Sequence, residues 1–220
     1  MIQKVEQSLL SGELTIPPSK SDAQRAILAA SLCEGRSEVH NIGNSNDVRA
    51  MIDCIKQIGA TVFENKNSVS IIGVRSFPKK AHFNCGESGL AFRLIAGICC
   101  VNEGVYHLDG QGSLLQRKHD FIDEFGREYG INIESNNGKL PYEIHGGSRS
   151  KALTVDGSTT SQFLSGLLMG IPLLNRKMKL TALSLKSAPY VEMTIATLHK
   201  FGLSIGVGDG DVFKIDSAST

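Results

Sequence analysis

Three segments of the chain follow the same plan, and this internal repeat constrains the fold more than any other feature of the sequence. Each segment is a stretch with helical periodicity that ends in glycine and is followed by two short runs of alternating residues. The three glycines are Gly59, Gly130 and Gly202, spaced at intervals of about 70 residues. This even spacing predicts one fold built from three similar units.

The first copy shows how each segment is expected to fold. Val48, Met51, Ile52 and Ile55 follow the i, i+3, i+4, i+7 spacing of a helix with one buried face, and Gly59 is suited to a left-handed cap. The two runs after each glycine are separated by turns rich in Asn or Gly, which predicts hairpins. The paired runs are ATVFE and SVSII, INIES and YEIHG, and LSIGV and VFKID.

A second kind of helix is expected ahead of each of these segments. The stretches 21–33, 88–100 and 161–174 are apolar nearly all round, which indicates burial. Short strand-like runs (EVHNI, YHLDG and KLTAL) link each buried helix to its surface helix. The fold class is therefore expected to be α/β, a pseudo-threefold repeat of αβαββ units with buried helices surrounded by surface helices and small sheets. We expect repeats at about 15–75, 82–147 and 152–216, within one domain spanning 15–220.

Composition excludes several classes of function. Hydrophobic residues make up 41% of the chain, enough for a substantial core, and 23 basic residues nearly balance 22 acidic ones. We therefore expect no nucleic-acid partner and no membrane partner. The five cysteines have no CxxC or Cys/His spacing, which favours reduced thiols, a cytoplasmic location, and neither metal nor cofactor.

The starts of the buried helices are the candidate binding positions. Ser21, Ser88 and Ser161 stand where these helices are expected to begin, and helix N-termini that converge would bind an anion. For each serine taken alone, simple N-capping is the favoured explanation, by about two to one. Lys20 and Arg25 add two cations to the first of these helix ends, which is unfavourable unless an anion lies nearby.

Four segments resemble those of the 5-enolpyruvylshikimate-3-phosphate (EPSP) synthases. PPSKSDAQRAIL is similar to that family's Lys-Ser-x-x-x-Arg segment, and DGSTTSQFLSGLLM to its Asp-Gly-Ser-x-Ser-Ser-Gln segment. KSAPYVEMT and CGESGLAFRL are similar to its Ser-x-Pro-Tyr and Gly-Asn-x-Gly-Thr-x-x-Arg segments. The resemblance spans about residues 16–214 and implies a shikimate-3-phosphate-binding domain. It also implies that residues 1–14 lead in from a missing second domain of the same protein, and that this half is inactive alone.

The resemblance implies transfer of the enolpyruvyl group of phosphoenolpyruvate to the 5-hydroxyl of shikimate 3-phosphate, through a tetrahedral intermediate. It assigns a catalytic role to Lys20 and places Gln162 between the two substrates. Arg25 with Ser21 would bind the carboxylate of shikimate 3-phosphate, and Tyr190 would lie beside its ring. The full set implied for shikimate 3-phosphate is Lys20, Ser21, Arg25, Thr160, Ser161, Gln162, Ser187 and Tyr190.

The phosphoenolpyruvate half departs from the family pattern. Glu87 and Leu90 stand where the family has Asn and Thr, and Ser113 aligns with an expected Arg. The candidate residues for this substrate are Gly89, Glu87, Arg93 and Arg117, with Lys118 an alternative to Arg117 as the replacement cation.

Two other functions stay open. One is the related UDP-N-acetylglucosamine enolpyruvyl transferase, although GQGSLLQRK lacks the cysteine usual in its catalytic loop. The other is a divergent homologue that binds a phosphorylated metabolite without enolpyruvyl transfer, which Glu87 and Ser113 would explain.

Overall fold

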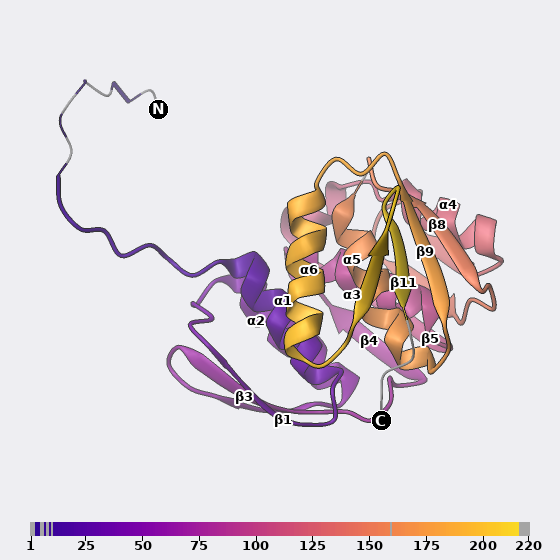
Figure 1. The fold of residues 1–220 in the computed structure, drawn as a ribbon, viewed down its shortest axis with the longest axis horizontal. Coiled ribbons are helices and arrows are strands. Elements are labelled where there is room, and N and C mark those ends of the chain that lie inside the picture. The colour runs from indigo at the N-terminus through magenta and orange to yellow at the C-terminus, as the bar shows by residue number, and fades with distance from the viewer. Residues whose placement is uncertain (1–2, 5–6, 8, 10, 159, 216–220) are drawn as a thin grey trace.

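The computed structural model describes residues 3–4, 7, 9, 11–158 and 160–215. Parts of the predicted segment 1–14 and the predicted last residue of the third repeat, Asp216, lie outside these residues. Helices occupy the interior and one side of the domain, and three small sheets surround them (Figure 1). The described N-terminal residues run in an extended path away from this body (Figure 1). Within the described ranges, no helix is both long and apolar enough to cross a lipid bilayer.

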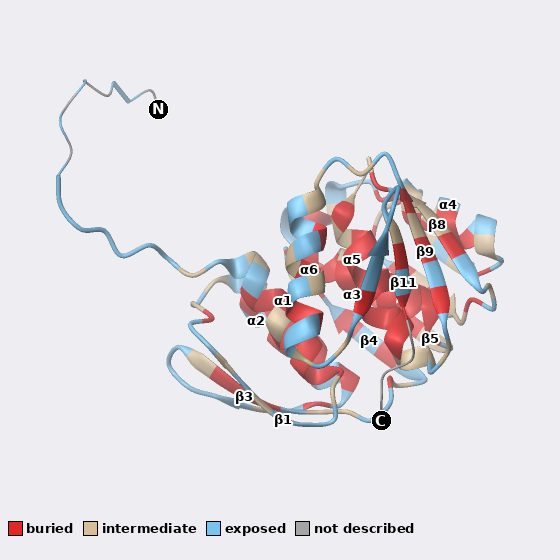
Figure 2. Ribbon diagram, viewed as in Figure 1, coloured by how far each residue is buried: buried red, intermediate tan, exposed pale blue. Residues whose placement is uncertain are grey.

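The three predicted buried helices are present: α1 (Lys20–Ser31), α3 (Gly89–Val101) and α5 (Ser161–Gly170). Figure 2 shows α3 and α5 at the centre, buried on all sides, as their uniformly apolar sequences predict. Their starting points differ slightly from the prediction. The caps are Ser19, Ser88 and Thr160, and each side chain accepts a hydrogen bond from a backbone N–H of the first turn.

Two glycines allow α3 and α5 to cross at backbone contact. A Cβ atom at Gly97 would lie 2.7 Å from the Phe163 carbonyl oxygen, and one at Gly166 would clash with the Leu94 carbonyl. Side chains at these positions would force the helices apart. The two helices therefore cross at backbone contact near their middles.

The predicted surface helices are α2 (Asn46–Ile58), α4 (Asp120–Tyr129) and α6 (Ala188–Lys200). Each is followed by the predicted glycine with positive φ: 105° at Gly59, 67° at Gly130 and 80° at Gly202. In α6 this glycine comes one residue after the C-cap, Phe201. Short 3₁₀ helices, η1 (Gly112–Gln116) and η2 (Ile171–Leu174), complete the helical elements.

All three predicted hairpins form antiparallel pairs. They are β2 (Thr61–Glu64) with β3 (Ser68–Gly73), β6 (Asn132–Ser135) with β7 (Tyr142–Gly146), and β10 (Ile205–Gly208) with β11 (Val212–Ile215). The predicted linking strands are β1 (Gly35–His40), β5 (Gly104–Asp109) and β9 (Met178–Leu183), and each pairs with the second strand of its hairpin.

The predicted αβαββ unit omits one strand in two of the copies. β4 (Lys80–Asn84) and β8 (Ala152–Asp156) precede the buried helices and pair in parallel with β5 and β9. The second and third sheets therefore have four strands, and the first has three, in the order β1-β3-β2. These strands are only five residues long, β4 with strictly alternating burial and β8 without it, and each is defined mainly by its pairing with a neighbouring strand.

Candidate functional site

Side-chain hydrogen bonds tie the starts of the three buried helices to one another. Ser88 Oγ donates to Gln24 Oε1 at 2.9 Å, which joins α3 to α1. Arg93 Nη1 donates to Gln162 Oε1 at 2.7 Å, which joins α3 to α5. The three helix N-termini, with their free N–H groups and partial positive charge, therefore lie at the same end of the fold.

Arg25 is almost completely buried, with 1% of its surface exposed. Its Nε donates to Thr194 Oγ1 at 2.7 Å, and its Nη1 donates to the Ser21 carbonyl at 3.0 Å. Thr194 Oγ1 lies 2.9 Å from Ser165 Oγ, which donates to the Ser161 carbonyl at 2.8 Å. This network holds the guanidinium in one place between α1, α5 and α6.

One nitrogen of the Arg25 guanidinium is not engaged by this network. Nη2 is buried and has no hydrogen-bond partner among the described residues. The guanidinium carbon lies 6.0 Å from the centre of the Tyr190 ring, and Tyr190 is itself half exposed. Burial lowers the pKa of Arg25, while Asp22 and Tyr190 partly offset this effect. A carboxylate that reached Nη2 would restore the hydrogen bond and charge compensation that burial removed.

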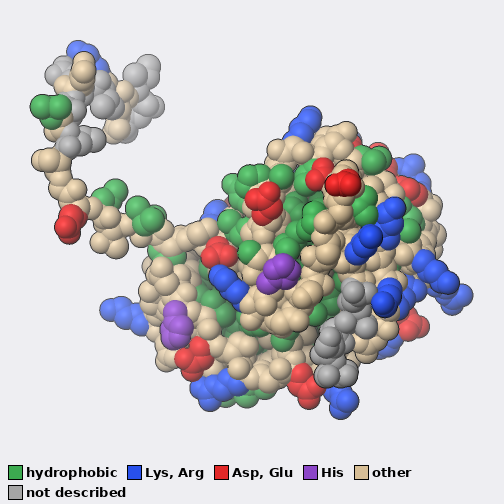
Figure 3. Space-filling view, in the orientation of Figure 1, with side chains coloured by type: hydrophobic (Ala, Val, Ile, Leu, Met, Phe, Trp, Pro, Cys, Tyr) green, Lys and Arg blue, Asp and Glu red, His purple; other side chains and the backbone are tan. Residues whose placement is uncertain are grey.

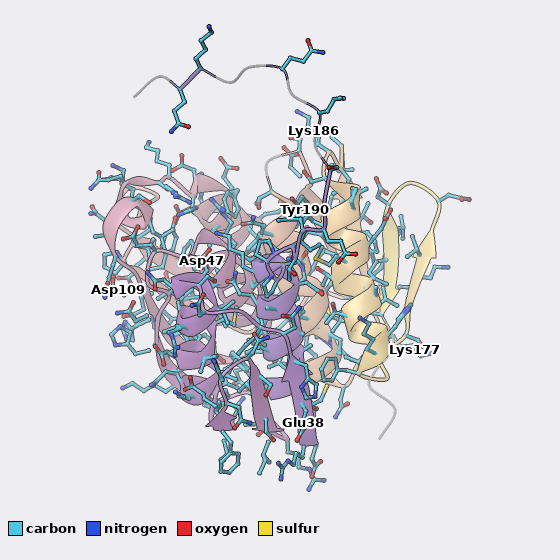
Figure 4. All side chains as sticks on the ribbon, turned by 90° about the vertical axis from the view of Figure 1, so that its left-hand side faces the viewer. Glu38, Asp47, Asp109, Lys177, Lys186 and Tyr190 are labelled. Atoms are coloured by element: carbon cyan, nitrogen blue, oxygen red, sulfur yellow. The ribbon has the colours of Figure 1, made fainter. Side chains whose placement is uncertain are left out.

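Lys20 already has an anionic partner within the chain. Its Nζ lies 2.7 Å from Asp47 Oδ2 at the start of α2, with side-chain exposures of 60% and 23%. Figure 4 shows Asp47 and Tyr190 near the same end of the helices, with Glu38 at the opposite end. The sequence prediction that two cations at this helix end need an anion is thus met in part by Asp47. The remaining exposure leaves Lys20 Nζ accessible to a substrate.

The start of α5 presents small polar side chains to the same end. Thr160 Oγ1 accepts from the Gln162 backbone N–H at 3.1 Å, and Ser161 is the first helical residue. Ser187 is the cap residue of α6, where its side chain makes no capping hydrogen bond. Ser187 is partly exposed, so its hydroxyl can meet a ligand.

The start of α3 gathers a second pair of cations. A Cβ atom built at Gly89 would lie 3.1 Å from Arg117 Nη1 and 3.2 Å from Arg93 Nη1, so both guanidinium groups lie beside the first residue of the helix. Arg117 Nη2 donates to Ser113 Oγ at 3.0 Å. Burial, and secondly the charge of Arg117, lower the pKa of Arg93.

Glu87 is exposed and its carboxyl group lies against the backbone of Gly112. Any Cβ atom at position 112 would clash with that carboxyl group, and the φ of Gly112 is 55°. A glycine at this position therefore permits both the turn and the placement of Glu87. The Glu87 side chain therefore packs on the start of η1, one residue before Ser113.

His119 is a fully buried residue that the sequence did not single out. Both ring nitrogens lack hydrogen-bond partners among the described residues, and the ring centre lies 4.6 Å from that of Phe92. Burial, Arg93 and Arg117 together lower the pKa of His119 to about 4, against an opposing effect from Asp120. The imidazole is therefore neutral near pH 7 and adds no charge to the arginine pair.

Sequence reasoning also missed residues that position the others. Asp47, Gln24 and Thr194 hold Lys20, Ser88 and Arg25 respectively. The sequence could have indicated Asp47, since an acidic residue is favoured in the first turn of a helix. Gln24 and Thr194 carried no such signal, because their partners lie 64 and 169 residues away in the chain.

The hollow beside α4 does not suit an anion. A broad hollow of about 790 Å³ beside α4 is lined by Asp120, Asp123, Glu124 and Glu134, with Arg127 as its one cation. Its carboxylates would repel a phosphate. Figure 3 shows basic and acidic side chains interspersed over the visible face of the domain.

Comparison with known proteins gives a consistent result. The family model described as EPSP synthase (3-phosphoshikimate 1-carboxyvinyltransferase) matches residues 5–219. A protein of Clostridium botulinum (strain Alaska E43 / Type E3) named 3-phosphoshikimate 1-carboxyvinyltransferase is 34% identical over 209 residues, covering 92% of this chain and 48% of that relative. One of the same name from Methanocorpusculum labreanum is 35% identical over 206 residues, covering 91% of this chain and 49% of that relative.

Two solved structures show the same fold. EPSP synthase from Acinetobacter baumannii superimposes with a TM-score of 0.78 at 23% identity, covering 95% of this chain and 47% of that one. The enolpyruvyl transferase NikO from Streptomyces tendae gives a TM-score of 0.63 at 14% identity, covering 94% and 49%. The chain thus spans about half the length of the curated relatives it matches. With a family model matched over nearly its whole length and relatives above 30% identity, this chain belongs to the EPSP synthase family.

Proposed function

We propose that the chain binds shikimate 3-phosphate at the convergent helix N-termini, as one half of a 3-phosphoshikimate 1-carboxyvinyltransferase. The reaction transfers the enolpyruvyl group of phosphoenolpyruvate to the 5-hydroxyl of shikimate 3-phosphate and releases phosphate. The observation that carries this proposal is Arg25, a buried guanidinium held by Thr194 with one nitrogen uncommitted, at the same end of the fold as three helix N-termini.

The two charged groups of shikimate 3-phosphate have matching partners at this end. Arg25 Nη2, with Ser21 beside it, suits the carboxylate, and the ring of Tyr190 suits an apolar face of the cyclohexene. The start of α5 suits the phosphate, because the Thr160 and Ser161 hydroxyls and the helix N-terminus favour negative charge. Ser187 can add a hydroxyl contact. Each charge-assisted hydrogen bond contributes roughly 1.5–3 kcal/mol when its partners are held in place.

We assign Lys20, the exposed cation at the start of α1, and Gln162, the amide held by Arg93 at the start of α5, to the reaction itself. Lys20 Nζ is exposed, and its ion pair with Asp47 can exchange for substrate oxygens. Gln162 is held by Arg93 through its carbonyl oxygen, which leaves its amide N–H groups free to donate to a substrate oxygen. Both would stabilise negative charge that develops during addition and elimination.

The 220 residues by themselves should bind but not turn over substrate. We expect the other half of the relatives' length to bring acid/base carboxylates and further cations, and to exclude water by closing over this face. Loss of general acid–base catalysis alone removes roughly 10²–10⁴-fold in rate. We place this activity in the cytosol, a location that the free thiols of all five cysteines support.

Calorimetric titration of the chain with shikimate 3-phosphate tests this function directly. Saturable binding is expected, with weaker or undetectable binding of shikimate, which lacks the phosphate. Lys20→Ala should weaken the affinity, while Lys177→Ala, near the other end of the helices in Figure 4, should leave it unchanged. If the chain does not bind shikimate 3-phosphate, the proposed substrate is wrong.

A second candidate is a divergent homologue that binds a phosphorylated metabolite without enolpyruvyl transfer. Glu87 and Ser113 favour it, since one adds a negative charge and the other stands in place of an expected cation. A third, UDP-N-acetylglucosamine enolpyruvyl transfer, predicts binding of that nucleotide sugar. Parallel titrations with phosphoenolpyruvate and UDP-N-acetylglucosamine separate these alternatives from the proposed one.

A further inference from the structure

The first sheet lacks the edge strand that the other two sheets have beside their linking strands. In those sheets β4 pairs in parallel with β5, and β8 pairs in parallel with β9. β1 is the counterpart of β5 and β9, but the order of its sheet is β1-β3-β2, so no strand among the described residues pairs with its other side. Alternate residues of β1 therefore direct backbone N–H and C=O groups away from β3, and these groups are available to another strand.

Residues 13–16, here called the arm, stand in the sequence where the missing strand would be. β4 and β8 each come directly before a buried helix, separated from it by residues 85–88 and 157–160. The arm, with the sequence ELTI, comes before α1 in the same way and is similar to ALTV at the start of β8. Instead of joining the sheet, the arm runs away from the body of the domain (Figure 1). The first repeat thus has an unpaired strand-like segment and an unpaired sheet edge.

The arm carries two large apolar side chains that are left in water. Leu14 and Ile16 are 85% and 76% exposed, and in a strand they would lie on the same face. Phe83 in β4 precedes the first residue of α3 by the same spacing as Leu14 precedes that of α1, and it pairs with Leu108. Phe83 and Leu108 are both fully buried. A strand formed by the arm would accordingly place Leu14 beside Val39 of β1, with both side chains toward the core.

The link between the arm and α1 disfavours pairing with the arm's own sheet. The links after β4 and β8 contain glycine: Gly86 has a φ of 55°, and a Cβ atom at Gly157 would lie 3.0 Å from the Cα atom of Leu185. The link before α1, residues 17–19, has the sequence PPS. Proline fixes φ near −65° and favours an extended conformation in the residue before it. The arm is therefore directed outward, where a second chain can receive it.

We propose that two copies of this chain exchange their arms, each arm adding as a parallel strand to the free edge of β1 in the other copy. Both first sheets would then have four strands, like the other two sheets. A Cβ atom at Gly43 would lie 3.5 Å from Pro18 Cγ, so the base of each arm lies close to the end of its own β1. A twofold axis beside this point would let both arms cross in one closed interface. The proposal is independent of the proposed substrate.

Sedimentation velocity of the 220-residue chain over a range of concentrations provides the first test. A reversible dimer is expected. Leu14→Asp should raise its dissociation constant by about tenfold or more, because an apolar contact is lost in both arms. Leu9→Asp is the matched control, since Leu9 is exposed and lies ahead of the arm, and it should leave the dimer unchanged. Pro18→Gly should lower the dimer fraction, because glycine lets the arm turn back onto its own sheet.

A chain that stays monomeric at its highest soluble concentration would overturn the proposal. So would equal losses of dimer in Leu14→Asp and Leu9→Asp. Urea unfolding of each variant shows that the domain itself is intact, which is expected because both substituted side chains lie in water outside its core.

Disulfide cross-linking tests which chain receives the arm. In the expected register Thr15 lies beside His40, so Thr15→Cys combined with His40→Cys should form covalent dimers under oxidised glutathione, and a reductant should separate them. Thr15→Cys combined with Arg36→Cys places the thiols about 13 Å apart along the strand and should not cross-link. The single variant Thr15→Cys measures any reaction with Cys33, the one native cysteine that is not buried among the described residues. A disulfide formed within one chain would show that the arm closes its own sheet, and the exchange would be wrong.

Discussion

Two cations lie at the start of α1 and two at the start of α3, but their charges are compensated differently in the two regions. At α1, Lys20 is paired with Asp47, and Arg25 is held in a network of hydroxyls and carbonyls. At α3, Arg93 and Arg117 face one another with only neutral partners. The first region is largely compensated before a ligand arrives, whereas the second becomes favourable when an anion binds.

The largest expected effect is on the pH dependence of the free energy of unfolding. It concerns His119, which is buried beside Arg93 and Arg117. Its folded pKa of about 4 lies below the ordinary value of 6.5, so the unfolded chain binds more protons between these pH values. The stability linked to neutral His119 is fully present above pH 6.5 and is lost as pH falls toward 4. It amounts to a free energy of unfolding on the order of 3 kcal/mol.

His119→Leu should flatten this part of the stability profile, measured by urea unfolding at several pH values. If His119→Leu retains the full acid sensitivity, burial and the two arginines do not lower the pKa of His119 as inferred.

The next effect separates the two regions by ligand. Arg25→Ala should weaken shikimate-3-phosphate binding by about 1–3 kcal/mol, because one charge-assisted contact is lost. Arg93→Ala should have a much smaller effect on the same ligand. Isothermal calorimetry of both variants measures the difference, and equal losses would show that the two regions form one undivided site.

A smaller effect tests the placement of Glu87. Gly112→Ala should destabilise the chain by about 1–2 kcal/mol, because a side chain is disfavoured at positive φ and would meet the Glu87 carboxyl group. Adding Glu87→Ala should recover part of the loss, since the clash is removed while the backbone strain stays. Thermal unfolding of the two single variants and the double variant measures this coupling. If the effects of the two substitutions on stability are strictly additive, the Glu87 carboxyl group does not lie against Gly112.

The smallest effect concerns the ion pair at α1. Asp47→Asn should reduce stability by less than about 1 kcal/mol, because the pair is partly exposed. It should raise the affinity for shikimate 3-phosphate by a few-fold, since Lys20 is released and a negative charge near the phosphate is removed. The gain should shrink at high salt. A loss of affinity would instead mean that Asp47 positions Lys20 for the substrate.

Much of the fold was predictable because it is encoded locally. The helical stripe of Val48, Met51 and Ile55, the glycine caps and the turn-separated runs all depend on neighbours within a few residues. Because the unit is repeated, the interpretation of one copy predicted the elements of all three. β4 and β8 were missed because a short strand is defined by its neighbour in the sheet.

The candidate site divides in the same way. The sequence by itself determined the residue types that gather at the helix starts, among them Lys20, Arg25, Ser161 and Arg93, because these belong to short segments with recognisable order. Only the tertiary structure decided which cations are compensated. Asp47 meets Lys20 across 27 residues, Thr194 meets Arg25 across 169, and Arg117 reaches Gly89 from the η1 turn. The physical reason is that charge compensation depends on distance in space, which folding sets, whereas the order of residues along the chain sets only which charges are available.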